Sequence, residues 1–452
     1  MQTSKNVCTR KKLSRYVSIY SRNQIVALYH SLTQEIVFCS AQDYEKRSPT
    51  LVNELMAKKI LLPMAYDEDK AITRIRTSIG DKPHFAVMYL FLTNNCNLGC
   101  RYCFVEGAKQ ECERPSAMTV QTAKNAVDKF GKAIQENSRI NEDGTPLILF
   151  FGGEPLMNFN TLKETAGYIE QKKNEGGLPQ NTKLILVTNG TLLTNEIVNF
   201  ITKKGIEVSV SIDGPKEIHD FNRRYKNGKG SFQGAYDGIK MLRNAGVKAC
   251  PSCTITDVNV ERMSEIIKRF IEEFGCKAAS MSYLMNTPAN NAYSDEEYIE
   301  KYAQNLIACF KICREKGVFE DRMMRRVLPF VSKTLHIKDC DGCGFQMVIT
   351  PDGKVGPCQA FAATKKYFTG DVNGPEYNPH KDETFYEWYS RTPFNMEKCQ
   401  TCAFLGNCGG GCAYSASVKH GNIWQQDELF CRFVKIITEW LIWDLYESMA
   451  ST

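Results

Sequence analysis

From residue 85 onward, short apolar runs alternate with segments whose apolar residues recur at helical spacing. Runs of this length, ended by glycine, asparagine or aspartate, are typical of buried parallel strands, and the segments between them are typical of amphipathic helices. The expected strands cover residues 85–92, 147–151, 183–188, 207–212, 247–255 and 277–284, and the expected helices cover residues 119–134, 161–173, 196–203, 232–245 and 260–274. Six βα units with right-handed crossovers predict an α/β fold, a partial (β/α)6 barrel similar to a TIM barrel.

Residues 1–83 show a different pattern. Three short β-rich runs cover residues 16–20, 25–29 and 35–39, and residues 51–59 carry apolar positions at helical spacing. Three strands and a helix in so short a segment predict a winged-helix-like α+β module. Such a module could bind a peptide by adding a strand to its open sheet edge, or it could be a simple N-terminal cap on the barrel.

The C-terminal part is rich in cysteine. Helical segments at residues 296–316 and 323–336 lead into residues 345–358, which predict a β-hairpin with a Pro-Asp-Gly turn. This hairpin would return Cys358 towards Cys343. We therefore expect three domains: the N-terminal module at 1–83, the barrel at 84–320 and a cysteine-rich domain at 321–452.

The composition is that of a globular chain, with 43% hydrophobic and 24% charged residues among 452. The net charge of +6 is spread along the sequence and interleaved with acids, which does not favour nucleic-acid binding. We expect no membrane span and no secretory signal, because no apolar run is long enough. The 19 cysteines then predict a reducing, cytoplasmic environment and metal ligation rather than disulfides.

Cys96, Cys100 and Cys103 form a CxxxCxxC run directly after the first barrel strand. Three thiolates on one loop can hold three irons of a [4Fe–4S] cluster and leave the fourth iron open for chemistry. The alternative is structural zinc, which prefers four ligands, usually in two CxxC-type pairs.

Three other barrel strands end in glycine-rich or polar sequences. Gly-Gly-Glu-Pro at 152–155 follows the second strand, Asn-Gly at 189–190 the third, and Asp-Gly at 213–214 the fourth. The C-terminal ends of the strands in such a barrel face one side, where active sites lie. We therefore expect these segments and the cysteine loop to meet at one site, where glycine allows a close backbone approach.

Eight further cysteines are enough for two sites with four ligands each, either clusters or zinc ions. They are Cys340, Cys343, Cys358, Cys399, Cys402, Cys408, Cys412 and Cys431. Their spacing alone does not show how they divide into two sites. Cys250 and Cys253 lie within an expected strand, which favours two buried thiols over a redox pair.

Together, these motifs resemble the radical SAM superfamily. The resemblance extends from residue 85 to the C-terminus and includes Tyr102, the aromatic residue before the last cysteine of the loop; the tail is similar to the SPASM extension of this family. It implies that S-adenosylmethionine binds the open iron. It also implies that an electron from the cluster cleaves S-adenosylmethionine to methionine and a 5′-deoxyadenosyl radical, which abstracts hydrogen from a substrate.

The resemblance also implies roles for individual residues. The Gly-Gly-Glu-Pro motif would receive the methionine ammonium group, Ser211 and Arg223 would bind the carboxylate, and Asn189 would contact the ribose or the amino acid. The alternatives are that Asp213 caps a helix and that Arg223 is a surface residue. The implied cofactor contacts are Tyr102, Gly152, Gly153, Glu154, Asn189, Ser211, Asp213 and Arg223.

In the SPASM family the ligands of two auxiliary [4Fe–4S] clusters interleave, which would bring the total to three clusters. By this likeness Cys340, Cys343, Cys358 and Cys412 hold the first, and Cys399, Cys402, Cys408 and Cys431 hold the second. The sulfatase maturases place more residues between the first two ligands, so Cys340 departs from that pattern.

Three functions are compatible with the sequence. The first is a maturase that forms thioether or other cross-links in a ribosomally made precursor peptide docked on the N-terminal module. The second is an anaerobic sulfatase-maturating enzyme that forms formylglycine, although Gln359 stands where those enzymes resemble one another in having aspartate. The third is a non-catalytic iron–sulfur electron carrier. Either enzyme would need a flavodoxin or ferredoxin-type reductant.

Overall fold

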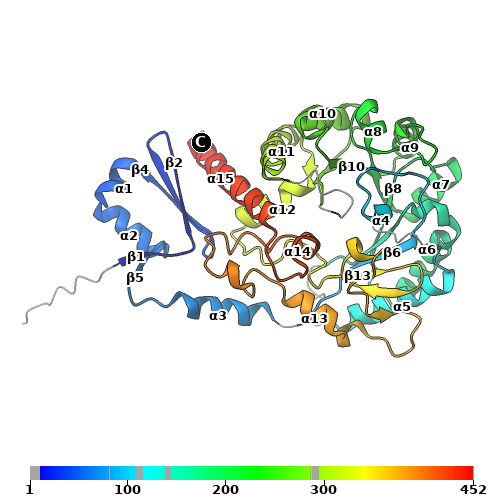
Figure 1. Ribbon diagram of the computed structural model, residues 1–452, viewed down its shortest axis with the longest axis horizontal. Helices are drawn as coiled ribbons and strands as arrows, with labels where there is room; N and C mark the ends of the chain where they lie inside the picture. The colour runs from blue at the N-terminus through cyan, green and yellow to red at the C-terminus, as the bar shows by residue number, and fades with distance from the viewer. Residues whose placement is uncertain are drawn as a thin grey trace, which may run out of the picture.

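The computed structural model describes residues 11–80, 82–107, 116–137, 144–285, 287 and 295–450. Its centre is a ten-stranded sheet with the order β12-β11-β10-β9-β8-β7-β6-β13-β14-β15, and a separate three-stranded sheet lies near the N-terminus (Figure 1). The expected α/β fold with a parallel central sheet is confirmed.

The six expected barrel strands are all present and run parallel to their neighbours. A short seventh strand, β12 (Phe319–Glu320), extends one edge of the sheet and pairs with β11. The sheet ends in β12 on one side and β15 on the other, so the barrel is partial. The six strands are β6 (Val87–Thr93), β7 (Leu147–Gly152), β8 (Lys183–Thr188), β9 (Glu207–Ser211), β10 (Ala249–Ile255) and β11 (Ala278–Tyr283).

Helices cover the outer face of this sheet (Figure 1). Along β9, residues alternate between a buried side against the helices and a partly exposed side, so the inner side of the barrel is accessible at this strand. The helices after the strands are α4 (Phe104–Gly107), α5 (Val120–Gln135), α6 (Phe159–Asn174), α7 (Asn195–Lys204), α8 (Lys216–Asn222), α9 (Phe232–Asn244), α10 (Met263–Phe274) and α11 (Glu296–Lys316), with short 3-10 turns at Pro155–Asn158 and Val260–Arg262.

The cysteine-rich segment continues the barrel sheet. The expected hairpin is present as β13 (Gln346–Ile349) and β14 (Lys354–Gly356), which pair antiparallel. The sequence did not indicate that β13 also pairs parallel with β6, which attaches the hairpin to the barrel. The other elements here are α12 (Asp321–Val331), β15 (Gly370–Asp371), α13 (Glu383–Ser390), α14 (Ala413–His420), α15 (Glu428–Ala450) and 3-10 turns at Gln359–Phe361, Pro379–Lys381 and Glu397–Cys399.

The three strands expected near the N-terminus form an antiparallel sheet in the order β2-β3-β4. One face of this sheet packs against α2 through Leu28 and Leu55, and the other packs against α15 through Tyr29 and Trp443. The elements of this module are β1 (Lys11–Leu13), β2 (Val17–Arg22), β3 (Ile25–His30), β4 (Glu35–Ser40), α1 (Ala41–Lys46), α2 (Pro49–Ala57), β5 (Leu61–Pro63) and α3 (Glu68–Ile79).

The long helix α15 joins the module to the barrel. Figure 1 shows it between the N-terminal sheet and the barrel helices. Phe38 of β4 packs on Trp443 of α15, while Asp444 accepts hydrogen bonds from Arg314 of α11 at 2.7 and 3.0 Å. Among the helices that the structure describes, none has both the length and the hydropathy needed to cross a membrane.

Candidate functional site

The loop that carries Cys96 is held directly against the Gly-Gly-Glu-Pro segment. Gly153 donates its backbone N–H to Thr93 at 2.8 Å, and Glu154 donates to the Asn95 carbonyl at 2.9 Å. A Cβ atom on Gly153 would lie 2.2 Å from the Asn95 oxygen, and one on Gly152 would lie 2.3 Å from the Thr93 oxygen. Both glycines are therefore needed for this close approach, and they fix the cysteine loop against the end of β7.

The Glu154 carboxylate connects the ends of β7 and β8. Its Oε1 accepts hydrogen bonds from Thr188 at 2.7 Å and from the Leu156 N–H at 3.1 Å, while its Oε2 accepts from the Asn189 N–H at 2.8 Å. Burial raises the pKa of Glu154 to about 7, although these three donors act in the opposite direction. The Glu154 side chain therefore connects the ends of β7 and β8, two of the strand ends that the sequence predicted to meet.

Asn189 reaches from the end of β8 to the cysteine loop. Its side-chain Nδ2 donates to Asn97 at 2.8 Å and lies 3.8 Å from the sulfur of Cys96. The Thr191 hydroxyl donates to the side-chain Oδ1 of Asn189 and also accepts from the Asn97 side chain at 2.8 Å. Sequence reasoning missed Asn97, whose position inside the CxxxCxxC run is the signal that could have found it.

Asp213 and Arg223 form a buried ion pair beneath Tyr102. The Asp213 carboxylate accepts from Arg223 Nε at 3.0 Å, from the Tyr102 hydroxyl at 2.5 Å and from the Thr254 N–H at 3.1 Å. The Arg223 guanidinium lies 5.2 Å from the centre of the Tyr102 ring. Four sequence segments are therefore connected through one carboxylate.

The two alternatives for this pair are wrong. Asp213 does not cap the following helix, because Pro215 occupies the N-cap position of α8 and the Asp213 carboxylate is used elsewhere. Arg223 is not a surface residue, since its side chain is only 11% exposed. Ser211, the last residue of β9, is partly exposed just before this pair.

His219 contacts the segment that carries Asp213 and Arg223. Its Nδ1 accepts from the Asp213 N–H at 3.3 Å, and its Nε2 lies 3.0 Å from the Ser231 hydroxyl, which donates to the Arg223 carbonyl. Burial lowers the pKa of His219 to about 4, so the ring is neutral near pH 7. A neutral, fully engaged ring orients the loop.

The thiols of the CxxxCxxC loop suit a metal cluster. Burial raises the pKa of Cys96 to about 11 and that of Cys100 to about 12, and each feels the charge of Cys103. Arg223 acts in the opposite direction on Cys100, which places the Asp213–Arg223 pair near this loop. The thiols of Cys96 and Cys100 therefore ionise only beside a cation, and together with Cys103 on the same loop they fit iron ligation.

The eight C-terminal cysteines fall into two groups. The Cys340 thiol is buried, which raises its pKa far above the ordinary value, and the charges of Cys343, Cys358 and Cys412 raise it further. Burial likewise raises the pKa of Cys431 to about 12, and its neighbours there are Cys399 and Cys402; the neighbours of Cys408 are Cys431 and Cys399. The interleaved division that the family resemblance implies groups these same neighbours, and it stays a prediction.

Each group is defined by cysteines whose negative charges raise one another's pKa. All cysteines in the described ranges are free thiols. Within those ranges, no three histidine, cysteine, aspartate or glutamate side chains meet at the spacing of a single metal ion. Cys340, which departs from the sulfatase-maturase spacing, still lies in the first group.

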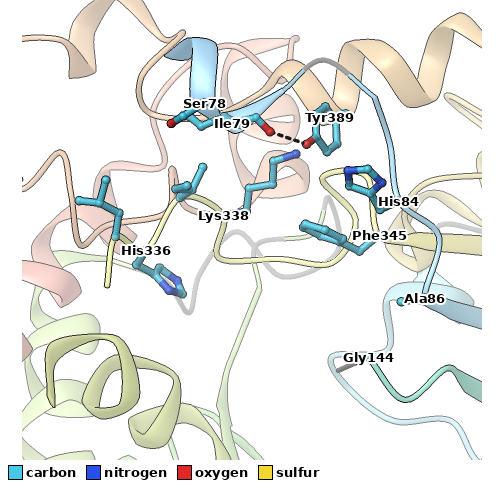
Figure 2. Close-up of a pocket in the computed structure, with 11 residues that line it drawn as sticks. Ser78, Ile79, His84, Ala86, Gly144, His336, Lys338, Phe345 and Tyr389 are labelled. Carbon is cyan, nitrogen blue, oxygen red and sulfur yellow. Dashed lines mark hydrogen bonds between the residues drawn. The ribbon is translucent and has the colours of Figure 1, made fainter. Parts of the chain in front are cut away.

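A cavity of about 530 Å³ lies away from the cysteine loop, at the opposite end of β6. Figure 2 shows Lys338 pointing towards Tyr389, whose hydroxyl donates to the Ile79 carbonyl at 3.0 Å. The Lys338 ammonium lies 3.0 Å from the Tyr389 ring centre and donates to the Cys343 carbonyl at 2.9 Å. The cavity therefore borders the first C-terminal cysteine group rather than the candidate active site.

Residues 90–270 match the family model described as the radical SAM superfamily. A serine-type anaerobic sulfatase-maturating enzyme of Bacteroides thetaiotaomicron is 34% identical over 348 residues, which cover 70% of this chain and 80% of that enzyme. The chain belongs to the radical SAM superfamily. The radical SAM cyclopropyl synthase TigE of Paramaledivibacter caminithermalis is 25% identical over 385 residues, which cover 83% of this chain and 77% of TigE.

The fold of this radical SAM protein is also similar to that of SuiB from Streptococcus suis. The crystal structure of SuiB with its precursor peptide SuiA aligns with a TM-score of 0.53 and 13% identity, covering 93% of this chain and 99% of SuiB. The family match and the curated relatives show that the protein is a radical SAM enzyme, a class that uses S-adenosylmethionine and a [4Fe–4S] cluster. The hypothesis of a non-catalytic electron carrier is therefore set aside.

Proposed function

We propose that this enzyme oxidatively modifies a ribosomally made precursor peptide, forming thioether cross-links between cysteine and carbon. The observation that carries the proposal is the N-terminal sheet, which has an open strand edge and is packed onto the cysteine-rich segment. SuiB, whose fold is similar over 93% of this chain, was solved with a precursor peptide. Peptide capture by strand addition uses such an edge.

The proposed cofactor site is the mouth of the barrel, with the cluster on Cys96, Cys100 and Cys103. When bound and reduced, the cluster and S-adenosylmethionine supply a 5′-deoxyadenosyl radical. Glu154 is fully buried, with its carboxylate occupied by three donors, so we assign it a positioning role. The backbone carbonyls of its motif would then receive the methionine ammonium group.

The other proposed contacts lie on both sides of the cysteine loop. Asn189 would bind the ribose or the amino acid group, and Ser211 and Arg223 would bind the carboxylate. Arg223 retains donors beyond the one used by Asp213, because a guanidinium has five N–H groups. Tyr102 and Asp213 hold the guanidinium in place.

The two C-terminal cysteine groups are proposed to hold two auxiliary [4Fe–4S] clusters, which makes three in total. Forming a cross-link removes two hydrogens from the peptide, and the radical removes only one of them. The second oxidation needs a nearby electron acceptor, which a fully ligated cluster provides. A flavodoxin or ferredoxin-type protein is the proposed reductant.

Strand β2 offers the open edge for peptide docking. The Ser31 N–H donates to the Tyr16 carbonyl at 3.0 Å, so Val17 and His30 are a pair without mutual hydrogen bonds. It follows that the backbone groups of Val17, Ile19 and Ser21 point away from β3. The Val17 N–H already donates to the Ser14 carbonyl at 3.2 Å, so Ile19 and Ser21 are the β2 residues proposed to pair with a docked strand; on the opposite edge the Ile36 carbonyl accepts from Lys58 at 2.9 Å.

The test uses a cysteine-containing peptide encoded beside the gene, incubated anaerobically with S-adenosylmethionine and a reductant. We expect a product that has lost two hydrogens and a thiol that no longer reacts with iodoacetamide. Formation of 5′-deoxyadenosine without any change in the mass of the peptide would refute this substrate.

The docking edge is tested with Ile19→Pro, which removes only an outward N–H, and with Ile19→Ala as the matched control. Proline should abolish peptide binding measured by fluorescence anisotropy, whereas alanine should retain it. Full binding by the proline variant would show that the peptide docks elsewhere, and the β4 edge would be next.

The second candidate is formylglycine formation, favoured by the 34% identity to a serine-type sulfatase-maturating enzyme. Oxidising serine to formylglycine also removes two hydrogens, so mass alone does not separate the two reactions. Trapping with a hydrazide does separate them, because only formylglycine carries an aldehyde. A hydrazone on a serine-containing sulfatase peptide would favour this second function.

A further inference from the structure

Arg391 is a completely buried cation of the cysteine-rich C-terminal segment. It follows α13, and its side chain is inaccessible to solvent. Within the described chain, its guanidinium donates to three backbone carbonyls: that of Ile423, that of Gly411 at 3.1 Å and that of Gln425 at 3.4 Å. These bonds use three of its five N–H groups, and carbonyl groups do not neutralise its charge.

The other buried arginines in the described ranges each form an ion pair with a carboxylate, whereas Arg391 forms none, although its charge opposes the rise in pKa that burial causes at Asp427. Arg223 is paired with Asp213, and Arg326 is paired with Asp339. A buried charge without such a partner is expensive, and proteins avoid it unless an opposite charge lies close by. Arg391 therefore indicates an anionic group in its surroundings.

Two kinds of acidic group lie around this cation: the buried Asp427, whose carboxylate accepts from the Cys412 N–H at 3.3 Å, and the cysteine ligands themselves. Gly411, which accepts from Arg391, directly precedes Cys412 of the first group, and the three glycines at 409–411 connect Cys412 to Cys408 of the second group. Burial raises the pKa values of Cys412 and Cys399, and the charge of Arg391 lowers both. One cation thus acts on a thiol of each group.

We propose that Arg391 is a fixed positive counter-charge shared by the two auxiliary clusters and that it raises the reduction potential of both. The proposal rests on the proposed auxiliary clusters. Four thiolates give a [4Fe–4S] cluster a net negative charge, and a nearby cation favours its reduced, more negative state. A higher potential makes these clusters better acceptors of the second electron. Arg391 acts here as a positioning and tuning residue, with no contact to substrate.

The experiment compares Arg391→Gln, which removes the charge, with Arg391→Lys, which keeps it. Both are purified anaerobically, their iron is counted, and their clusters are titrated potentiometrically by electron paramagnetic resonance. In Arg391→Gln the equilibrium constant for reduction of the auxiliary clusters should fall at least tenfold, which lowers their reduction potential by about 59 mV for a one-electron couple. Arg391→Lys should keep the wild-type potentials. The cluster whose signal responds to S-adenosylmethionine is the internal reference and should not shift.

Each outcome decides the matter. Unchanged auxiliary potentials in Arg391→Gln would overturn the proposal, and so would equal shifts in both variants. If Arg391→Gln fails to load auxiliary iron, loading of Arg391→Lys to wild-type content and potentials supports a charge requirement, whereas failure of both shows a purely structural role. Wild-type enzyme with only four irons would instead refute the auxiliary clusters themselves, independently of Arg391.

Discussion

Replacing Gly153 by alanine tests whether the cofactor site depends on the close approach of two loops. The new Cβ would lie 2.2 Å from the Asn95 oxygen and 3.1 Å from the Cys96 nitrogen. Ordinary contact needs more than 3 Å, so the loops must separate by about 1 Å, a shift that can cost about 100-fold in rate. The two backbone hydrogen bonds that join them, each worth about 1 kcal/mol, would weaken as well.

The assay is the rate of 5′-deoxyadenosine formation under reducing, anaerobic conditions, with circular dichroism to verify folding. Gly167 of α6 is the matched control, because nothing lies within 4 Å of a Cβ added there. Gly167→Ala should keep full activity and gain up to about 1 kcal/mol of stability. A folded Gly153→Ala enzyme with more than half of the wild-type rate would show that the contact between the loops is dispensable.

Three further predictions concern other parts of the molecule. Because burial raises the pKa of Glu154 to about 7, its carboxylate loses its charge as pH falls below 7. The affinity for S-adenosylmethionine, measured by calorimetry, should therefore rise from pH 6 to pH 8. The Glu154→Gln variant should bind S-adenosylmethionine weakly at both pH values. Asp213→Asn leaves Arg223 buried and unpaired and should cost about 3 kcal/mol in chemical denaturation. The exposed pair of Glu297 and Lys301 is its control, since Glu297→Gln should change stability by less than about 0.5 kcal/mol, and equal losses would contradict the reasoning. The double substitution Cys358→Ser with Cys412→Ser should lower the iron content from about twelve to about eight, while Cys309→Ser, at a buried thiol of α11, should leave it near twelve; equal iron in both would contradict the grouping.

The pH dependence of the affinity for S-adenosylmethionine can be separated from the pH dependence of folding stability. The ordinary pKa of a glutamate carboxyl is 4.5, so between pH 4.5 and 7 the folded state binds a proton at Glu154 that the unfolded state has released. The contribution of Glu154 to the free energy of unfolding therefore falls as pH rises through this range. A gain in affinity between pH 6 and 7 would therefore come from the charged Glu154 carboxylate positioning the loops rather than from a more stable fold.

Elements with strong periodicity were predictable from the sequence. The expected strand at 183–188 coincides with β8, and the expected helix at 296–316 coincides with α11. A continuous apolar strand followed by glycine or asparagine leaves few alternatives, because such runs are typical of parallel strands covered by helices. The meeting of the strand-end motifs followed from the barrel topology alone.

Features that depend on contacts between distant segments were not predictable. Parallel pairing of β13 with β6 joins residues far apart in sequence, and the spacing of the residues carries no signal for it. Asp213 has a typical capping residue type before a helix, yet its carboxylate accepts from Tyr102, Arg223 and Thr254. Helix α15 was missed, although its apolar residues recur at helical spacing.

The most direct test of the central claim is the electron paramagnetic resonance spectrum of the reduced protein, recorded with and without S-adenosylmethionine. A cluster on Cys96, Cys100 and Cys103 with one open iron predicts that the cofactor changes part of the spectrum and that Cys100→Ala removes the responsive part. A spectrum that the cofactor leaves unchanged, or a protein that contains zinc in place of iron, would contradict the account.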